Sequence, residues 1–167
     1  SSDLTQTPYI LHPLEAASIV GTMTADDEII AAAVLHDVIE DTPATKEQIE
    51  EIFGERVAAL VSAESEDKRE ELPAELTWKT RKEETIRRLK TASAEVKMVA
   101  LGDKLSNIRS IYRDQLEFGD ELWSRFNQKD KQEHYRYYKG IAECFEELKN
   151  YCAYEEYAEL VEKTFKK

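Results

Sequence analysis

A histidine and an aspartate, His36 and Asp37, stand side by side directly after the apolar run 29–35. That run has no polar face, so we expect it to form a helix buried at the centre of a bundle. Imidazole nitrogen and carboxylate oxygen are both ligands for divalent transition metals. Burying an unpaired aspartate is costly, so a cation or a basic partner must stabilise it. The pair therefore predicts either one side of a metal site or an ordinary polar helix end.

Two further acidic residues, Glu40 and Asp41, follow His36 and Asp37 at an interval of four positions. Residues four apart on a helix lie one turn apart on the same face, so the acidic side chains would stack beyond the candidate ligands. These groups repel one another unless water surrounds them or a cation lies among them. The apolar run before them makes full solvation unfavourable, which favours the cation.

A third candidate, Asp103, interrupts the largely apolar run 96–102. Gly102 beside it has no side chain, which allows another helix or a ligand to approach closely. Asn107 lies one turn further along the same helix face. Two histidine nitrogens with two aspartate oxygens would form a mixed site that suits Mn²⁺, Fe²⁺ or Zn²⁺ better than Ca²⁺. The alternative for Asp103 is a buried ion pair with a lysine.

The elements that position these residues are all expected to be helices. The chain of 167 residues is 35% charged and has only five glycines and four prolines, a composition typical of long helices. We expect a single all-α domain, a helical bundle, over residues 1–167. In the first half we expect a helix with Pro13 in its first turn, a helix capped by Asp26 and Asp27 that runs on through His36 to Asp41, a short helix that begins with a Thr45–Gln48 capping box and ends at Gly54, and an apolar stripe at 57–61. A surface loop at 64–76 and a basic helix at 76–90 follow. The second half is expected to hold a helix from Ser93 to Gly119, a short aromatic connector at 123–127 and two amphipathic helices in 131–167.

Charge restricts the class of partner. The formal net charge of −12 repels polyanions, so we expect neither nucleic acid nor an anionic membrane as a partner. A small phosphorylated substrate needs only local positive charge, which a bound cation supplies. No apolar run reaches the ~18–20 residues that span a bilayer. The two cysteines, Cys144 and Cys152, do not form a paired motif, and they indicate a reducing, cytoplasmic setting.

Three ordered blocks carry a resemblance to a known family: PYILHP at 8–13, HDVIEDT at 36–42 and GDKLSN at 102–107. Together they resemble the signature blocks of the HD hydrolase domain in RelA/SpoT-type guanosine tetraphosphate (ppGpp) hydrolases, above all the small stand-alone alarmone hydrolases. The resemblance extends over roughly residues 8–150. It implies an all-α HD-domain bundle and removal of pyrophosphate from the 3′ position of ppGpp, which leaves GDP.

The resemblance also implies roles for individual residues. It implies one divalent ion, Mn²⁺, held by the ligands His12, His36, Asp37 and Asp103. Glu40 and Asp41 would position or deprotonate the attacking water. The substrate contacts that it implies are Asn107, Lys68, Arg81 and Lys82.

One feature departs from that group, whose members carry an Arg-Lys pair shortly before the PYILHP block. Residues 1–7 contain neither arginine nor lysine. We expect either that the natural N-terminus extends further or that other residues select the base. Three interpretations stay open: a ppGpp hydrolase, an HD-type nucleotidase or pyrophosphohydrolase for another nucleotide, and a non-catalytic nucleotide-binding module. Glu40 and Asp41 favour an enzyme, since binding alone does not need them.

The remaining aromatic and basic residues are expected to be structural or to contact phosphate. His134 is interpreted as a surface helix residue. Trp78, Trp123 and Phe126 are expected to pack in the core rather than to stack on a base. The basic residues of 81–90 are either a solvated helix face or phosphate contacts.

Overall fold

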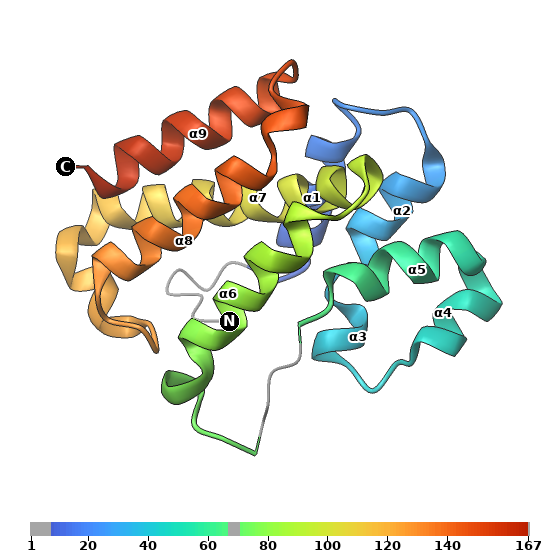
Figure 1. Cartoon of the computed structure of the whole chain (residues 1–167), viewed down its shortest axis with the longest axis horizontal. Coiled ribbons are helices and arrows are strands. Elements are labelled where there is room, and N and C mark those ends of the chain that lie inside the picture. The colour runs from blue at the N-terminus through green and yellow to red at the C-terminus, as the bar shows by residue number, and fades with distance from the viewer. Residues whose placement is uncertain (1–7, 67–70, 167) are drawn as a thin grey trace.

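The computed structural model describes residues 8–66 and 71–166, and over these ranges every regular element is a helix (Figure 1). The all-α prediction is therefore confirmed. In chain order the helices are α1 (Leu11–Val20), α2 (Asp27–Leu35), α3 (Val38–Asp41), α4 (Lys46–Phe53), α5 (Glu55–Glu64), α6 (Ala74–Lys90), α7 (Ala94–Phe118), the 3₁₀ helix η1 (Gly119–Arg125), α8 (Lys131–Cys144), the 3₁₀ helix η2 (Glu146–Leu148) and α9 (Cys152–Phe165).

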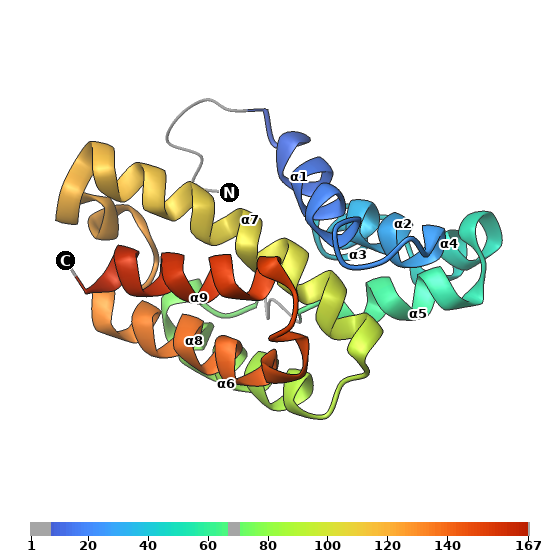
Figure 2. The same cartoon turned by 90° about the horizontal axis from the view of Figure 1, so that it is seen from above.

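The long helix α7 runs through the middle of the molecule (Figure 2). It packs against α1, α2 and α5 on one side and against α9 on the other. Five of its apolar side chains are almost completely buried: Val99, Ala100, Leu101, Leu105 and Ile108. The prediction that the apolar helix 29–35 occupies the centre is therefore wrong. In α2 only Ile29, Ala32 and Ala33 are buried, and the other apolar side chains are half-buried, because α7 takes the central position.

Helix α1 lies unusually close to α7 at Gly102. A Cβ atom on this glycine would lie 2.7 Å from the carbonyl oxygen of Ala16 and 2.7 Å from Cγ2 of Val20. The predicted close approach at Gly102 is therefore confirmed, and its partner is the backbone of α1. The contact brings the first turn of α1, which carries His12, beside the segment of α7 that carries Asp103.

Several predicted helix ends are confirmed. The Asp26 carboxylate accepts hydrogen bonds from the backbone N–H groups of Glu28 and Ile29, at 3.0 and 3.4 Å. Thr45 and Gln48 form the expected capping box at the start of α4, and Gly54 ends that helix with a positive φ of 91°. Such caps satisfy backbone groups that a helix end leaves unpaired.

The predicted surface loop at 64–76 is too long. Glu64 is the last residue of α5, and α6 begins at Ala74, directly after Pro73.

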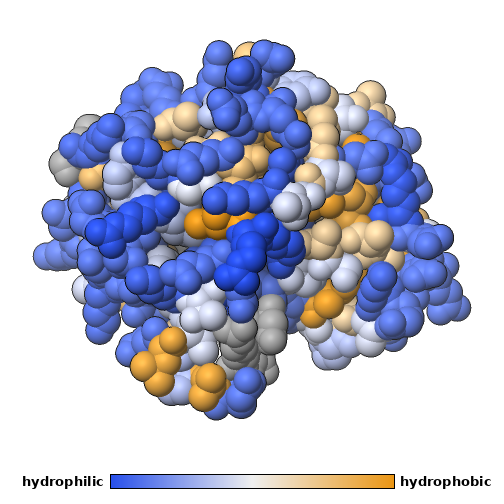
Figure 3. Space-filling view, in the orientation of Figure 1, coloured by the Kyte–Doolittle hydropathy of each residue, from blue (hydrophilic) through white to orange (hydrophobic). Residues whose placement is uncertain are grey.

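The face of the molecule in Figure 3 is covered mainly by hydrophilic residues, with apolar residues showing in small groups. Within the described ranges, no helix combines the length and the apolar composition that crossing a bilayer requires.

Candidate metal centre and the pocket around it

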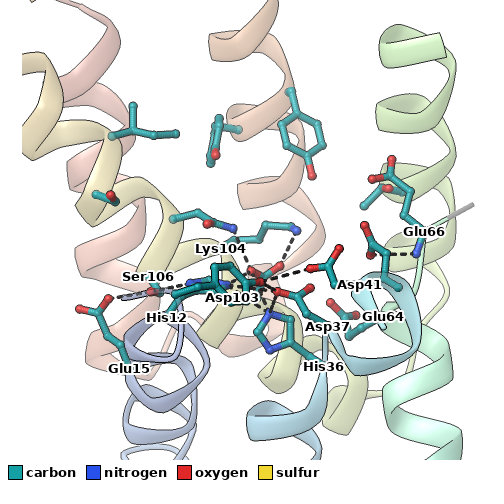
Figure 4. Close-up of a pocket in the computed structure, with 18 of the residues that line it drawn as sticks. His12, Glu15, His36, Asp37, Asp41, Glu64, Glu66, Asp103, Lys104 and Ser106 are labelled. Carbon is teal, nitrogen blue, oxygen red and sulfur yellow. Dashed lines mark hydrogen bonds and ion pairs between the residues drawn. The ribbon is translucent and has the colours of Figure 1, made fainter. Parts of the chain in front are cut away.

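Four side chains from three separate parts of the chain converge at one point (Figure 4). His12 lies in α1, His36 and Asp37 lie between α2 and α3, and Asp103 lies in α7. The Nε2 atom of His12 lies 3.2 Å from Nε2 of His36 and 3.0 Å from Oδ1 of Asp103. His36 Nε2 lies 3.4 Å from Asp103 Oδ1 and 3.1 Å from Asp37 Oδ2. The structure thus brings together all four predicted ligands.

These spacings fit a divalent cation. Ligand atoms bound at ~2.0–2.2 Å from one ion lie roughly 3.0–3.5 Å from their neighbours. The ligand atoms of His12, His36 and Asp103 all lie within 4.8 Å of one another. Asp37 Oδ2 lies 3.1 Å from Nε2 of His36 and 3.8 Å from Nε2 of His12. Two imidazoles and two carboxylates form the mixed donor set of a transition-metal site.

The electrostatics of the cluster favour positive charge at its centre. Burial opposes the anion of Asp103, but Lys104, whose Nζ lies 2.5 Å from Oδ2, and His36 outweigh it and hold the pKa of Asp103 well below its usual range. Burial also opposes the imidazolium of His36, but the Asp103 and Asp37 carboxylates outweigh it and raise the pKa of His36 to about 11. The same negative field that holds a proton on His36 would hold a divalent cation.

His36 and Asp37 lie at a break between α2 and α3. His36 Nδ1–H donates to the carbonyl of Ala33 at 2.7 Å, so the side chain takes an acceptor that the next turn would otherwise use. α2 ends at Leu35, and Asp37 has φ −94° and ψ −3°. The expectation of one continuous helix through His36 to Asp41 is therefore wrong. Adjacent helical residues point about 100° apart, so the two side chains approach the cluster from different directions, and His36 Nε2 meets Asp37 Oδ2 at 3.1 Å.

A cavity of about 1030 Å³ opens beside the cluster. Its lining includes the cluster residues, an acidic group, a basic group and an aromatic group. The acidic group is Glu40, Asp41, Glu64 and Glu66; the basic group is Lys82, Arg88, Lys104 and Arg113; the aromatic group is Tyr9, Trp78, Phe126, His134, Tyr137 and Tyr138. The cavity is large enough for a nucleotide, since small-molecule sites typically occupy ~300–1,000 Å³.

The predicted catalytic acids lie on the wall of this cavity in α3. The Glu40 carboxylate accepts the backbone N–H of Glu66 at 3.3 Å. Tyr9 lies between two carboxylates: its hydroxyl donates to Asp37 and lies 3.5 Å from Oδ2 of Asp41. Both acids therefore line the same cavity as the cluster.

Two of the four predicted substrate contacts line the cavity. Asn107 lines the cavity and donates from Nδ2 to Asp103 Oδ1 at 2.8 Å. Lys82 also lines it, with Nζ 3.2 Å from Oε2 of Glu66. Arg81 is not among the described lining residues, because its guanidinium turns to Thr77 Oγ1 at 3.2 Å and to Glu66 at 3.5 Å. Lys68 lies outside the described residues.

His134 is buried, contrary to prediction. It is only 5% exposed, so the prediction of a surface residue is wrong. Its Nε2–H donates to the carbonyl of Gln128 at 2.7 Å, and burial lowers its pKa. The rings of Trp78, Trp123 and Phe126 surround it at centroid distances of 5.1–5.2 Å. Both tryptophans are buried, as predicted, but Trp78 also lines the cavity, and Phe126, which was predicted to pack with them, is half-buried in its lining.

Glu64 lines the cavity, although the sequence predicted it to lie in a surface loop. It ends α5, and its Oε1 is buried without a hydrogen-bond partner. Burial, with a smaller contribution from Asp103, raises the pKa of Glu64 to about 7, although Lys104 and Arg88 oppose the shift. Glu64 continues the helix face formed by Val57, Leu60 and Val61. This spacing could have predicted that Glu64 belongs to the helix.

Sequence comparison gives the chain several relatives. The family described as "HD domain" matches residues 1–126. A guanosine-3′,5′-bis(diphosphate) 3′-pyrophosphohydrolase from Aquifex aeolicus is 39% identical over 108 residues, which cover 63% of this chain and 15% of the relative. A GTP pyrophosphokinase from Myxococcus xanthus is 37% identical over 107 residues, which cover 62% of this chain and 14% of the relative. The matched region is thus a small part of the length of these curated relatives.

Two solved structures cover almost the whole chain. The crystal structure of lmo0812 from Listeria monocytogenes EGD-e has a TM-score of 0.82 and 32% identity, and the match covers 99% of this chain and 100% of that one. A second structure is described as a metazoan ortholog of SpoT that hydrolyzes ppGpp. It has a TM-score of 0.74 and 25% identity, and the match covers 97% of this chain and 84% of that one.

Proposed function

This chain belongs to the HD domain family, and we propose that it is a metal-dependent phosphohydrolase that removes pyrophosphate from the 3′ position of ppGpp, leaving GDP. The convergence of His12, His36, Asp37 and Asp103 beside a nucleotide-sized cavity carries the proposal. The names of the Aquifex relative and of the metazoan neighbour, both of which refer to this compound, support it. We propose the cytoplasm as its compartment, in keeping with the free thiols of Cys144 and Cys152.

The proposed cofactor is one Mn²⁺ ion, held by His12, His36, Asp37 and Asp103. When bound, such an ion lowers the pKa of water and neutralises charge on phosphoryl oxygens. The mixed nitrogen and oxygen donor set supports Mn²⁺ over Ca²⁺, which takes six to eight oxygen ligands. Asp37 and Asp103 are held as anions by their surroundings, so both are ready to accept a cation.

The acids in α3 supply the proton acceptor. In the proposed reaction a water oxygen bonds to the phosphorus attached to O3′, the bond between that phosphorus and O3′ breaks, and O3′ takes up a proton. Glu40 and Asp41 line the cavity beside the cluster, where a carboxylate can accept a proton from the attacking water. Tyr9 fixes the direction of the neighbouring Asp37 carboxylate through its hydroxyl.

The basic wall supplies charge for the phosphates. Lys82 and Arg88 project from α6 into the cavity, and Lys104 projects from α7. Lysine and arginine stabilise the negative charge of phosphoryl oxygens through charge-assisted hydrogen bonds. Asn107 is the proposed contact to the nucleotide sugar or its phosphate. Arg81 supports this wall through its pairing with Glu66.

Product analysis tests the proposal directly. Metal-stripped protein is incubated with ppGpp with and without Mn²⁺, and GDP and pyrophosphate are quantified. We expect both products in equal amounts only with Mn²⁺, none from Asp103→Ala, and full activity from Arg56→Ala, whose ion pairs lie away from the cavity. Unchanged ppGpp in the presence of folded, Mn²⁺-loaded protein would contradict the proposed substrate and direct the search to other nucleotides.

A further inference from the structure

The nitrogen of His12 that faces away from the cluster begins a chain of hydrogen bonds. His12 Nδ1 lies 2.9 Å from the hydroxyl of Ser106, and that hydroxyl donates to Oε2 of Glu15 at 2.6 Å (Figure 4). A serine hydroxyl has one hydrogen, and here it points to the carboxylate. Ser106 must therefore accept the Nδ1–H of His12, which leaves the lone pair of Nε2 directed at the cluster.

The chain continues from Glu15 to the C-terminal helix. The second oxygen of Glu15 accepts from Arg109 Nη1 at 3.0 Å. Arg109 also donates from Nε and Nη2 to the two oxygens of Glu156, at 2.6 and 2.7 Å. Arg109 lies in α7 and Glu156 in α9, so hydrogen bonds connect α9 to a proposed metal ligand in α1.

We propose that Ser106, Glu15 and Arg109 are positioning residues that hold His12 with Nε2 toward the metal ion, and that Glu156 makes α9 part of this support. The inference rests on the proposed function only in taking the cluster as a metal centre. Groups that bind the outer nitrogen of a ligating histidine fix its tautomer and orientation, and their loss typically weakens metal binding ~10–100-fold.

A contribution to fold stability alone explains the hydrogen-bonded chain of Ser106, Glu15 and Arg109 less well than positioning of His12 does. Exposed ion pairs contribute little to stability, and the side chains of Arg109 and Glu15 are 32% and 31% exposed. Ser106, however, is 3% exposed and connects this ion pair directly to His12. Arg56 offers a matched control: it pairs with Asp26, Glu28 and Glu95, its side chain is 37% exposed, and it does not line the cavity.

The first measurement is the affinity for Mn²⁺ alone, determined by calorimetry on metal-stripped protein, together with the thermal unfolding midpoint. We expect binding to weaken ~10–100-fold in Ser106→Ala and Glu15→Ala and a smaller loss in Arg109→Ala. Glu15→Gln retains an acceptor for Ser106 and should recover most of the affinity. Arg56→Ala should bind Mn²⁺ like the unmodified chain, even where its midpoint falls as far as that of Arg109→Ala.

The second measurement reads the tautomer of His12. The chain has only three histidines, so ¹H–¹⁵N spectra of the Zn²⁺-loaded protein resolve each ring. We expect a protonated Nδ1 on His12 and loss of its slowly exchanging signal in Ser106→Ala. Unchanged Mn²⁺ affinity in both Glu15→Ala and Ser106→Ala, or a protonated Nε2 on His12, would overturn the inference. Neither measurement uses ppGpp, so failure of the proposed substrate would be seen separately.

Discussion

The Nε2 atoms of His12 and His36 lie 3.2 Å apart, although the two residues are 24 positions apart in the chain. Two imidazole lone pairs at this distance repel unless a proton or a cation lies between them. Asp103 Oδ1 lies within 3.4 Å of both nitrogens and adds negative charge at the same point. A proton and a metal ion therefore compete for one position, which makes metal binding depend on pH.

We expect Mn²⁺ binding to strengthen as the pH rises. The pKa of His36 is raised to about 11, so below that pH the ring carries a proton that the metal must displace. Ligands must be deprotonated to bind, so affinity should rise by up to ~tenfold per pH unit between pH 6.5 and 9. Calorimetry in buffers of different ionisation enthalpy should show release of about one proton per metal ion. Binding without proton release would contradict this assignment.

The metal-stripped protein should show the opposite trend in stability. A raised folded-state pKa on His36 stabilises the protein fully below the unfolded value of 6.5, and this contribution is lost as the pH rises toward about 11. The unfolding midpoint without metal should therefore fall over this range more steeply than it does in His36→Gln. Equal slopes for the two proteins would show that His36 does not carry the proton.

Replacing the acids of α3 should separate catalysis from metal binding. Glu40→Gln and Asp41→Asn keep the shape of the side chain but remove a proton acceptor. Loss of a general base typically lowers kcat ~10²–10⁴-fold. The Glu40 carboxylate accepts the backbone N–H of Glu66 and the Asp41 carboxylate lies beside Tyr9, so the affinity for Mn²⁺ should change little. If both variants and the double variant turn over ppGpp like the unmodified chain, these acids have no role in the chemistry.

Glu64→Gln should stabilise the protein at alkaline pH. Burial raises the pKa of Glu64 to about 7, so the folded state favours the neutral acid, and stability is lost as the pH rises from 4.5 through 7. Glutamine resembles the neutral acid and does not titrate. The unfolding midpoint of Glu64→Gln should exceed that of the unmodified chain at pH 8, and the difference should shrink toward pH 4.5. Glu47→Gln, on the exposed face of α4, is the control and should show no such gain above pH 7.

The sequence predicted which side chains converge because these residues interrupt apolar surroundings. Asp103 and the His36–Asp37 pair stand where aliphatic side chains are expected, and His12 lies in a recognisable block. The helix break after Leu35 was not predictable from periodicity, because it depends on a hydrogen bond between the His36 side chain and the carbonyl of Ala33.

Burial caused by distant elements was also beyond the sequence analysis. His134 belongs to a helix with many polar residues, and it is buried only because Trp78 of α6 and Trp123 of η1 pack on it. Glu64 follows an apolar stripe but precedes a charged segment, so the sequence offered two interpretations. The central place of α7 likewise depends on how the other helices pack. Composition alone would have placed α2 at the centre, because the run 29–35 is more apolar than α7.

Gly102→Ala should weaken the metal site through the backbone of α1. The new Cβ would lie 2.7 Å from the carbonyl oxygen of Ala16, which cannot rotate away, so α1 must shift. Ala16 lies one turn after His12 on the same helix face, and the shift therefore moves a proposed ligand. Overpacking of this kind costs about 1–3 kcal/mol, more than the ~1 kcal/mol that alanine gains over glycine in a helix. Both the unfolding midpoint and the Mn²⁺ affinity should fall.

Gly140→Ala is the matched control for this prediction. Its Cβ would also meet an atom at a short distance, 2.8 Å, but that atom is Cδ1 of Ile86, the end of a flexible side chain on α6. Ile86 can change rotamer, so the gain in helix propensity should largely offset the contact, and Mn²⁺ affinity should stay unchanged. The unfolding midpoint and the Mn²⁺ affinity of both variants are compared by thermal unfolding and calorimetry. If Gly102→Ala keeps the midpoint and affinity of the unmodified chain, close contact between α1 and α7 does not position His12.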